Sequence, residues 1–269
     1  MPTPKPRLKP LSALVALAIL AGGGTAAHSF DPTKTFKADD DPLVILRFGY
    51  NALKKGNMDD AIGAFKFGAQ KNDLASQWKL AHMMQTGAGG KQDDFAAYEL
   101  YTLIANRFAD EMPARNEIGY VSNALVALGR YELRGIKGTA VRANPRRAED
   151  YFYRAAALFH DPNAQYELGR LYRSKALGTR QPMSAARWYG LAARKGHIVA
   201  QAELGEMLFY GDGVERRPVH GLLLMTRAVA SDPNQTSKSV RRIHDKAFSK
   251  ATEHERNAVE SLWSSRQKN

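Results

Sequence analysis

Over most of the chain, apolar side chains recur three and four positions apart, and no stretch keeps the apolar–polar alternation of a half-buried strand. The segment AQYELGRLY at residues 164–172 returns as AQAELGEML at residues 200–208. In the first copy, Ala164, Leu168 and Tyr172 lie four residues apart, so they form one apolar stripe along a helix. The pattern predicts an all-α fold built from a repeated unit.

A second helix is expected after each copy of this segment. Residues 144–160 and 181–197 align with each other, with proline at their second position and paired alanines further along, and residues 217–231 are a weaker copy. Proline is favoured in the first turn of a helix, and the glycines of residues 210–218 favour a left-handed turn before it. Each unit is therefore predicted to be a helix–turn–helix hairpin that buries its apolar face by stacking on its neighbours.

The register gives about five units over residues 43–234, and the middle unit holds an inserted loop near residues 134–144. The Leu-Gly pairs of the last two units place Gly169 and Gly205 inside helices, where glycine costs about 1 kcal/mol relative to alanine. That cost is offset where the absence of a side chain lets a neighbouring helix come into contact with the glycine. We therefore expect the second helix of each hairpin to approach closely at these glycines.

The repeat has the residues of a known type. AQAELGEMLFYGDGV and AARWYGLAARKGH, both within residues 185–214, closely resemble Sel1-like repeats, whereas residues 48–70 fit the shorter tetratricopeptide pattern. The resemblance implies a right-handed α/α superhelical solenoid. Near its end, Thr252 and Glu255 have the spacing of a capping box, so residues 235–269 are expected to form capping helices with a basic tail.

Residues 1–27 have the three parts of a secretory signal peptide: a basic start, an apolar run, and small residues up to Ala27. The apolar run is shorter than the roughly 20 residues that cross a bilayer, so an uncleaved membrane anchor is the weaker alternative. We therefore expect cleavage after Ala27, export to the periplasm and a flexible lead-in over residues 28–42. No later segment is apolar enough for a membrane span after cleavage.

Charge and cysteine content narrow the classes of partner. The sequence has no cysteine, which excludes disulfides, thiolate metal ligands and a cysteine nucleophile. Its formal net charge is +12, and loss of residues 1–27, which carry three positive charges and no negative one, leaves +9. Such a charge is typical of proteins that bind nucleic acid or another anionic surface. Because we expect export, an acidic protein or an anionic envelope polymer is favoured over nucleic acid.

Motifs for catalysis and for cofactor binding are missing. The sequence has no complete phosphate-binding loop, no GxSxG, no HExxH and no cluster of histidines at ligand spacing. Ser76 and Lys79 have the SxxK spacing of penicillin-binding enzymes, but the other motifs of those enzymes are missing. His160 and His197 are placed at equivalent positions of the repeat, which indicates a role in the turn rather than in metal binding. We predict no enzyme activity, no cofactor and no metal.

One column of side chains is expected to face a partner. It consists of the residue after each Leu-Gly or Leu-Ala pair, which points away from the apolar stripe, and of two arginines near the ends of the same helices. In chain order the column is His82, Arg130, Arg134, Arg170, Arg173 and Glu206. Because the column is mostly basic and first helices of such hairpins line the concave side, it predicts binding of an acidic partner surface. Solubility is the alternative explanation for these charges.

The layout of the chain as a whole resembles the periplasmic negative regulators of exopolysaccharide production. The shared features are the signal peptide, the acidic lead-in, one tetratricopeptide-like unit, several Sel1-like units and a basic end. The resemblance implies that the protein binds the periplasmic domain of a transmembrane sensor histidine kinase, holds the kinase inactive and so lowers exopolysaccharide synthesis. Two alternatives stay open: a scaffold or adaptor for an envelope assembly or secretion complex, and a hydrolase of an envelope polymer. The repeats occupy nearly the whole mature chain, which argues against the hydrolase.

Overall fold

The computed structural model describes residues 31–37, 39–232 and 237–267, and within these ranges every regular element is a helix. The predicted signal peptide, residues 1–27, lies outside them. The all-α fold that the apolar periodicity predicts is confirmed, because neither long alternating segments nor strands occur in the described ranges.

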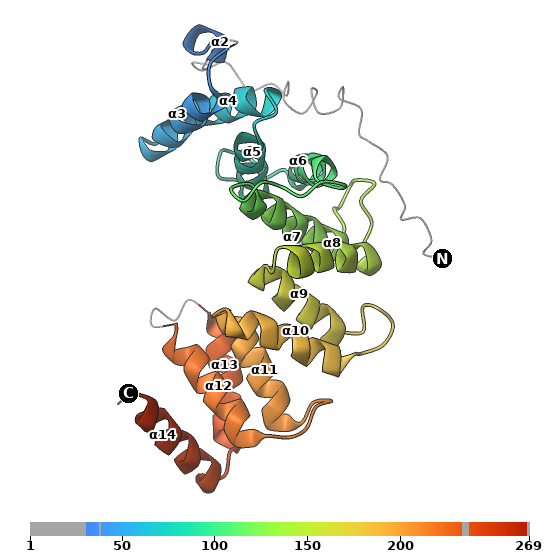
Figure 1. Cartoon of the computed structure of the whole chain (residues 1–269), viewed down its shortest axis with the longest axis vertical. Helices are drawn as coiled ribbons and strands as arrows, with labels where there is room; N and C mark the ends of the chain where they lie inside the picture. Colours follow the sequence, from blue (N-terminus) through green and yellow to red (C-terminus); the bar gives the residue numbers. More distant parts are fainter. Residues whose placement is uncertain (1–30, 38, 233–236, 268–269) are drawn as a thin grey trace. The chain divides into compact units, whose positions relative to one another are not determined.

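The chain divides into two compact units, an N-terminal unit of Met1–Asn144 and a C-terminal unit of Pro145–Asn269. The helices of the N-terminal unit are α2 (Pro32–Thr35), α3 (Pro42–Lys54), α4 (Met58–Gln70), α5 (Leu74–Thr86), α6 (Asp94–Arg107) and α7 (Ile118–Arg134). Those of the C-terminal unit are α8 (Pro145–Leu158), α9 (Pro162–Arg173), α10 (Pro182–Arg194), α11 (Ile198–Tyr210), α12 (Pro218–Ala230), α13 (Lys238–Lys250) and α14 (Glu253–Gln267). Within each unit, helices that follow one another from α3 to α13 pack side by side as a series of hairpins (Figure 1).

Helix starts and ends follow from local sequence. α8, α10 and α12 begin at Pro145, Pro182 and Pro218, the prolines that the repeat alignment predicted. Asp161 caps α9 with its carboxylate, which accepts hydrogen bonds from backbone N–H groups of the first turn. Gly211 ends α11 in the left-handed conformation, with φ 71°, as expected for this turn.

The glycines inside α9 and α11 mark close contacts between the helices of a hairpin. A Cβ atom on Gly169 would overlap the ring of Tyr189 on α10. A Cβ atom on Gly205 would lie 2.7 Å from the carbonyl oxygen of Gly221 on α12, closer than real Cβ atoms come. The predicted close approach is confirmed in both hairpins.

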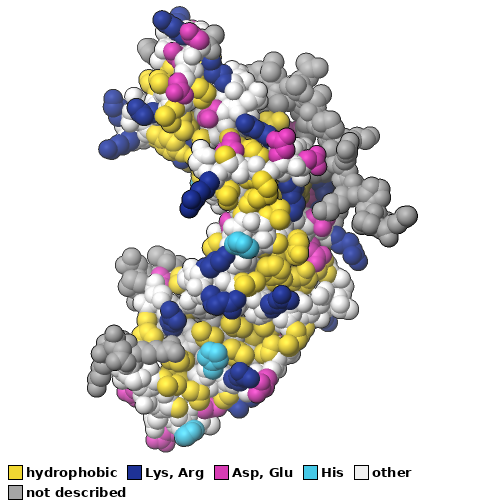
Figure 2. All heavy atoms as spheres, in the orientation of Figure 1, with side chains coloured by type: hydrophobic (Ala, Val, Ile, Leu, Met, Phe, Trp, Pro, Cys, Tyr) yellow, Lys and Arg dark blue, Asp and Glu magenta, His cyan; other side chains and the backbone are white. Residues whose placement is uncertain are grey.

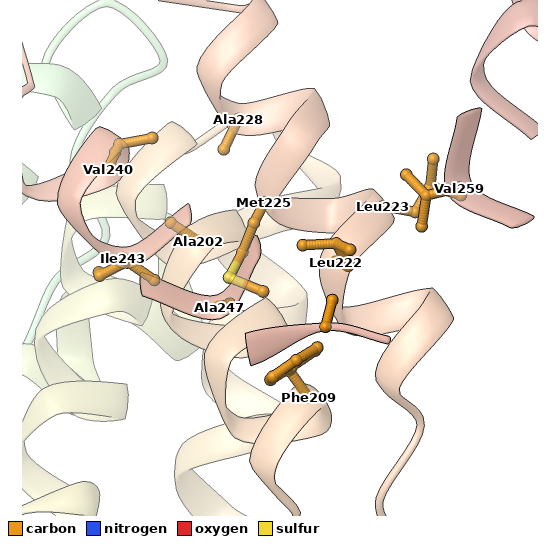
Figure 3. Packing of buried hydrophobic residues seen from close by; sticks show 11 residues of the cluster. Ala202, Phe209, Leu222, Leu223, Met225, Ala228, Val240, Ile243, Ala247 and Val259 are labelled. Carbon is orange, nitrogen blue, oxygen red and sulfur yellow. The ribbon is translucent and has the colours of Figure 1, made fainter. Parts of the chain in front are cut away.

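The last hairpin of the C-terminal unit shares one apolar core with α13 and α14 (Figure 3). Leu222 and Met225 of α12 are fully buried there. Val240 and Ile243 of α13 pack on one side of the cluster, and Val259 of α14 packs on another. The end of the repeat series is thus covered by two helices that bury its apolar side.

The predicted capping box forms at the start of α14. The backbone N–H of Thr252 donates to Glu255 Oε2 at 2.8 Å, and the backbone N–H of Glu255 donates to Thr252 Oγ1 at 3.2 Å. Arg216, in the turn before α12, donates to Glu255 Oε1 at 3.1 Å. The same carboxylate therefore caps α14 and ties it to the preceding hairpin.

The lead-in differs from its prediction at one residue. Phe36 is 6% exposed and lies between Phe48 of α3 and Phe67 of α4, with ring centroids 5.2 and 5.7 Å away. The prediction of a flexible lead-in over residues 28–42 is therefore wrong at Phe36. An aromatic side chain at this position gains enough buried area against the first hairpin to hold its segment in place.

Candidate protein-interaction surface

The described part of the chain shows where the side chains of a possible metal site and of the SxxK match lie. No group of three or more His, Asp or Glu side chains lies close enough together there to hold a metal ion. Ser76, the serine of the SxxK match, is fully buried on α5, and its side chain packs against Gly68 of α4. A hydroxyl enclosed between two helices does not reach a substrate, so the SxxK spacing reflects packing.

His160 and His197 both lie in turns, but the prediction that they occupy equivalent positions is wrong. His160 has φ 55°, the left-handed conformation that Gly196 adopts in the next turn of this kind. His197 is the N-cap of α11, where Nδ1 accepts a hydrogen bond from the backbone N–H of Ala200 at 3.1 Å; Asp161 has this role for α9. His160 therefore lies one position before the N-cap of its next helix, whereas His197 is the N-cap itself. The difference of one position arises because α8 has 14 residues and α10 has 13.

In the N-terminal unit, the first helices of successive hairpins bring aromatic and cationic side chains together. This aromatic cluster consists of Tyr50 on α3, Trp78, Lys79 and His82 on α5, and Tyr120 on α7. The rings of Trp78 and His82, one turn apart, stack with centroids 5.3 Å apart and planes 3° apart. Tyr120 lies 5.6 Å from Trp78, and Lys79 Nζ lies 5.3 Å above the ring of Tyr50.

The aromatic cluster is half-buried, and most of it is uncharged. Tyr50 is 40% exposed, and the other members are partly exposed. Burial and then the charge of Lys79 lower the pKa of His82, and burial and then Tyr120 raise the pKa of Tyr50. Both groups are therefore neutral at pH 7, and the charge of the cluster comes from Lys79. Half-exposed aromatic side chains beside a cation are typical of the centres of protein interfaces.

The C-terminal unit has a smaller counterpart at the same place in the repeat. Tyr166 on α9 stands two residues before the Leu-Gly pair, as Trp78 stands before its Leu-Ala pair. Its ring stacks on His197 at 4.6 Å, and the guanidinium of Arg170 lies 5.9 Å from its centroid. In both repeats the predicted column residue, His82 or Arg170, thus contacts an aromatic ring one turn earlier. His82 and Arg170 belong to the predicted column, whereas Lys79 and the aromatic side chains were missed. The fixed distance of Trp78 and Tyr166 from their pairs is nevertheless visible in the sequence.

An ion-pair network joins α9, α11 and α13 in the C-terminal unit. Its members are Arg173, Arg180, Lys246, Glu203, Glu206 and Asp212. Arg173 pairs with Glu206 at 2.9 Å and with Asp212 at 3.1 Å, so the structure brings two residues of the predicted column into direct contact. Three cations face three carboxylates, and the charges of the network balance.

The pKa values of two carboxylates of this network shift in opposite directions, although burial raises both. It raises the pKa of Glu203, although Arg173 opposes the shift. It also raises the pKa of Asp212, but hydrogen bonds from Arg180 and Arg173 outweigh it, and the pKa of Asp212 ends below its ordinary value. The network is therefore a structural tie between neighbouring hairpins, in which Arg173 compensates charges that burial would otherwise disfavour.

The remaining column residues are distributed over both units. Arg134 pairs with Asp94 at 3.1 Å, and Arg170 pairs with the buried Glu167 at 3.0 Å. Arg130 is exposed on α7. Within their own units, most charges of the column are therefore compensated, and the excess of positive charge lies elsewhere. Contact of these six residues with a partner stays a prediction.

The surface is mixed in character. On the face that Figure 2 shows, hydrophobic side chains are exposed in both units, and Lys and Arg are scattered among them. On α8 and α10 the exposed residues include Tyr153 and Met183, at 54% and 69%. None of the helices in the described ranges combines the length and the apolar character that a membrane span needs.

Comparison with known proteins identifies the repeats. The Sel1 repeat family matches residues 74–107, 122–158, 162–197 and 198–232. In chain order these ranges cover α5 and α6, then α7 and α8, then α9 and α10, and last α11 and α12. The hairpin of α3 and α4, which has the tetratricopeptide pattern, lies before the first of them.

Two relatives align over nearly their full length. The exopolysaccharide production negative regulator of Rhizobium meliloti (strain 1021) is 32% identical over 252 residues, which cover 93% of this chain and 92% of the relative. The protein of the same description from Rhizobium leguminosarum bv. viciae is 32% identical over 248 residues, which cover 92% and 90%. The crystal structure of a Sel1 repeat protein from Oxalobacter formigenes matches 76% of this chain and 75% of that chain, with a TM-score of 0.59 and 22% identity. That match concerns the fold alone.

Proposed function

This chain belongs to the Sel1-repeat family and to the family of the exopolysaccharide production negative regulators, and we propose that it lowers exopolysaccharide synthesis by binding and restraining a signalling protein. The observation that carries the proposal is the likeness to two such regulators over more than nine tenths of the chain. The repeat architecture supports a binding role, because stacked helical hairpins present extended surfaces for partners.

The partner that we propose is the periplasmic domain of a transmembrane sensor histidine kinase. The periplasm is the proposed site of action because residues 1–27 have the pattern of a signal peptide. Repression requires only that the chain bind the inactive state of the kinase more tightly than the active state. A difference of about 1–3 kcal/mol, typical of regulatory coupling, is sufficient for such control. In this proposal the protein acts by binding, without a catalytic step.

The contact that we propose is the aromatic cluster of the N-terminal unit. Tyr50 is exposed, and Trp78 provides a broad ring held in place by its stack with His82. Side chains of this kind contribute most to binding when they are fixed before the partner arrives, since little entropy is then lost. Lys79, next to Tyr50, supplies the positive charge for an acidic group of the partner.

Deletion of the gene tests the regulatory role. We expect a deletion strain to produce more exopolysaccharide and to phosphorylate the response regulator of the kinase more strongly, and a copy of the gene to restore both. Unchanged polysaccharide and unchanged phosphorylation would contradict the proposal. Capture of the chain's partners from membranes distinguishes it from the scaffold alternative, in which a secretion or assembly component is the main partner.

Substitutions in the aromatic cluster test the contact. For the full chain with Tyr50→Ala and Lys79→Ala, we expect binding to the kinase's periplasmic domain to weaken at least about tenfold, or roughly 1.4 kcal/mol. Tyr153→Ala is the matched control, because Tyr153 is an exposed tyrosine on α8, outside the cluster. It should leave the affinity within about twofold. Circular dichroism checks that both variants fold, and equal affinities of the two would refute the assigned contact.

A further inference from the structure

A second surface, on α13, is strongly cationic, whereas the aromatic cluster is mostly uncharged. Residues 216–250 contain eight Lys and Arg and only two Asp. The apolar side of α13, with Val240, Ile243 and Ala247, is buried in the core that α11 and α12 share with it. Its polar side therefore faces solvent, and the cations on that side are exposed: Lys238, Arg241, Arg242, Lys246 and Lys250.

Four of these five cations have no acidic partner among the described residues, since only Lys246 pairs, with Glu206 at 3.7 Å. Lys238, Arg241 and Arg242, which lie near the start of α13, form no ion pair with any other residue in the described ranges, unlike Arg173 of the network. The two aspartates nearby are engaged: Asp232 accepts a hydrogen bond from the backbone N–H of Ser237 at 2.8 Å, and Asp245 contacts His244 at 3.0 Å. The charge of the three cations is therefore available to an outside anion.

The same three cations line a cavity between the end of α12 and the first turns of α13. Its volume is about 620 Å³, within the usual range for ligand sites. Val229 and Val240 form part of its wall. Lys246 adds a fourth cation to the lining, which also includes the two carboxylates of Asp232 and Asp245. The cavity offers room for a bulky anionic group and not only for a small ion.

We propose that this cationic face of α13, defined by Lys238, Arg241 and Arg242, binds an acidic polysaccharide. Guanidinium groups hold carboxylates by paired hydrogen bonds, and a linear polymer engages several cations at once. Phe248 on the same helix is 44% exposed, but His244 stacks on its ring at 5.6 Å and Arg256 lies 5.7 Å from its centroid, so the three cations carry the proposal. The role of such a site rests on the proposed function. A repressor of exopolysaccharide synthesis that binds an acidic polysaccharide would make the rate of synthesis depend on the amount of polymer already present.

Two other kinds of partner fit this face less well. Centres of protein interfaces are depleted in charged residues and rich in aromatic side chains, whereas the α13 face exposes five cations beside the single phenylalanine Phe248. Insertion into a bilayer would need an exposed apolar side, but Val240, Ile243 and Ala247 are already buried. The observations therefore favour a polymer of spaced negative charges over an acidic protein or a membrane.

The test is binding of the purified full chain to polygalacturonate, a carboxylated polysaccharide, with neutral dextran for comparison. We expect binding to polygalacturonate that weakens with added salt, and none to dextran. The triple variant Lys238→Ala/Arg241→Ala/Arg242→Ala should bind at least about tenfold more weakly. The matched control Lys54→Ala/Lys55→Ala/Lys91→Ala removes three exposed lysines of the N-terminal unit and should change affinity by less than about twofold.

A fourth protein separates charge from folding. Arg241→Lys/Arg242→Lys keeps both charges but loses the paired hydrogen bonds, so it should bind more weakly than the wild type and more tightly than the triple variant, and circular dichroism verifies the fold of each variant. The proposal is overturned by equal binding to dextran, by wild-type affinity of the triple variant, or by equal losses in the triple variant and its control. It is also overturned if anionic vesicles or poly-glutamate bind through α13 and polygalacturonate does not.

The two proposals fail independently. Binding to polygalacturonate is measured with purified components, whereas repression is measured in the deletion strain. Polysaccharide binding without an effect of deletion would remove the regulatory role and keep the α13 site. An effect of deletion without polysaccharide binding would do the reverse.

Discussion

At the residue scale, Gly169 and Tyr189 show how one absent side chain sets the distance between two helices. Tyr189 is fully buried, and its ring occupies the space that a Cβ atom on Gly169 would need. Gly190, on the same hairpin, is different, since a Cβ atom there would meet nothing closer than 3.8 Å. The two glycines therefore provide a matched pair for measuring the contact.

We predict that Gly169→Ala lowers the free energy of unfolding by about 1–3 kcal/mol, because the added methyl group forces the buried ring aside. Gly190→Ala should leave that free energy unchanged or raise it by up to about 1 kcal/mol, since alanine is the better helix former. Urea unfolding followed by circular dichroism measures both. A stable Gly169→Ala variant would mean that the two helices separate more easily than their packing implies.

At the element scale, α14 depends on a cap that connects it to the rest of its unit. Thr252 and Glu255 satisfy each other's backbone N–H groups, and Arg216 holds the carboxylate from the neighbouring turn. Hydrogen bonding to the backbone of Thr252 is the main reason that the pKa of Glu255 lies below its ordinary value. The start of the helix thus has both a local and a tertiary support.

We predict that Thr252→Ala costs about 1 kcal/mol of stability, the usual effect of losing an N-cap hydroxyl. The loss should be concentrated in α14, so amide hydrogen exchange in its first turn should speed up more than exchange in α11 or α12. Ser249→Ala, close by but outside the cap, is the control and should change neither quantity. Uniform acceleration across the whole unit would argue against a local cap.

At the scale of the whole molecule, the division into two compact units predicts that each has its own core. Two apolar clusters of the C-terminal unit, one around Tyr189 and one around Met225, consist entirely of residues after Pro145. Repeat proteins of this kind gain stability from contacts between neighbouring hairpins, so a contiguous series with its cap contains what it needs to fold.

We predict that a fragment of residues 145–269 expressed alone is helical and unfolds cooperatively in urea. A shorter fragment, residues 145–231, lacks α13 and α14 and exposes Leu222 and Met225, so it should be less stable or aggregate. Circular dichroism and size-exclusion chromatography compare the two. A non-cooperative longer fragment would show that the C-terminal unit needs the N-terminal unit to fold.

The helices, their boundaries and the close contacts at Gly169 and Gly205 were predictable from sequence. Apolar spacing, helix-starting prolines and capping residues act over a few neighbouring positions, so their effects repeat wherever the letters repeat. The same reasoning failed at His160 and His197, because a single extra residue in α8 shifts one alignment against the other. It also overlooked Phe36, whose burial depends on side chains from two later helices.

The sequence by itself determined that this protein is a series of Sel1-type helical hairpins and that its surface is basic. Only the tertiary structure decided which charges stay available, because ion pairs such as Arg173 with Glu206 join residues 33 positions apart. It likewise decided that Tyr50, Trp78 and Tyr120 form one cluster, since three separate helices must pack before those rings meet. Local patterns thus specify the elements, whereas the composition of a surface follows from distances that only the packed chain defines.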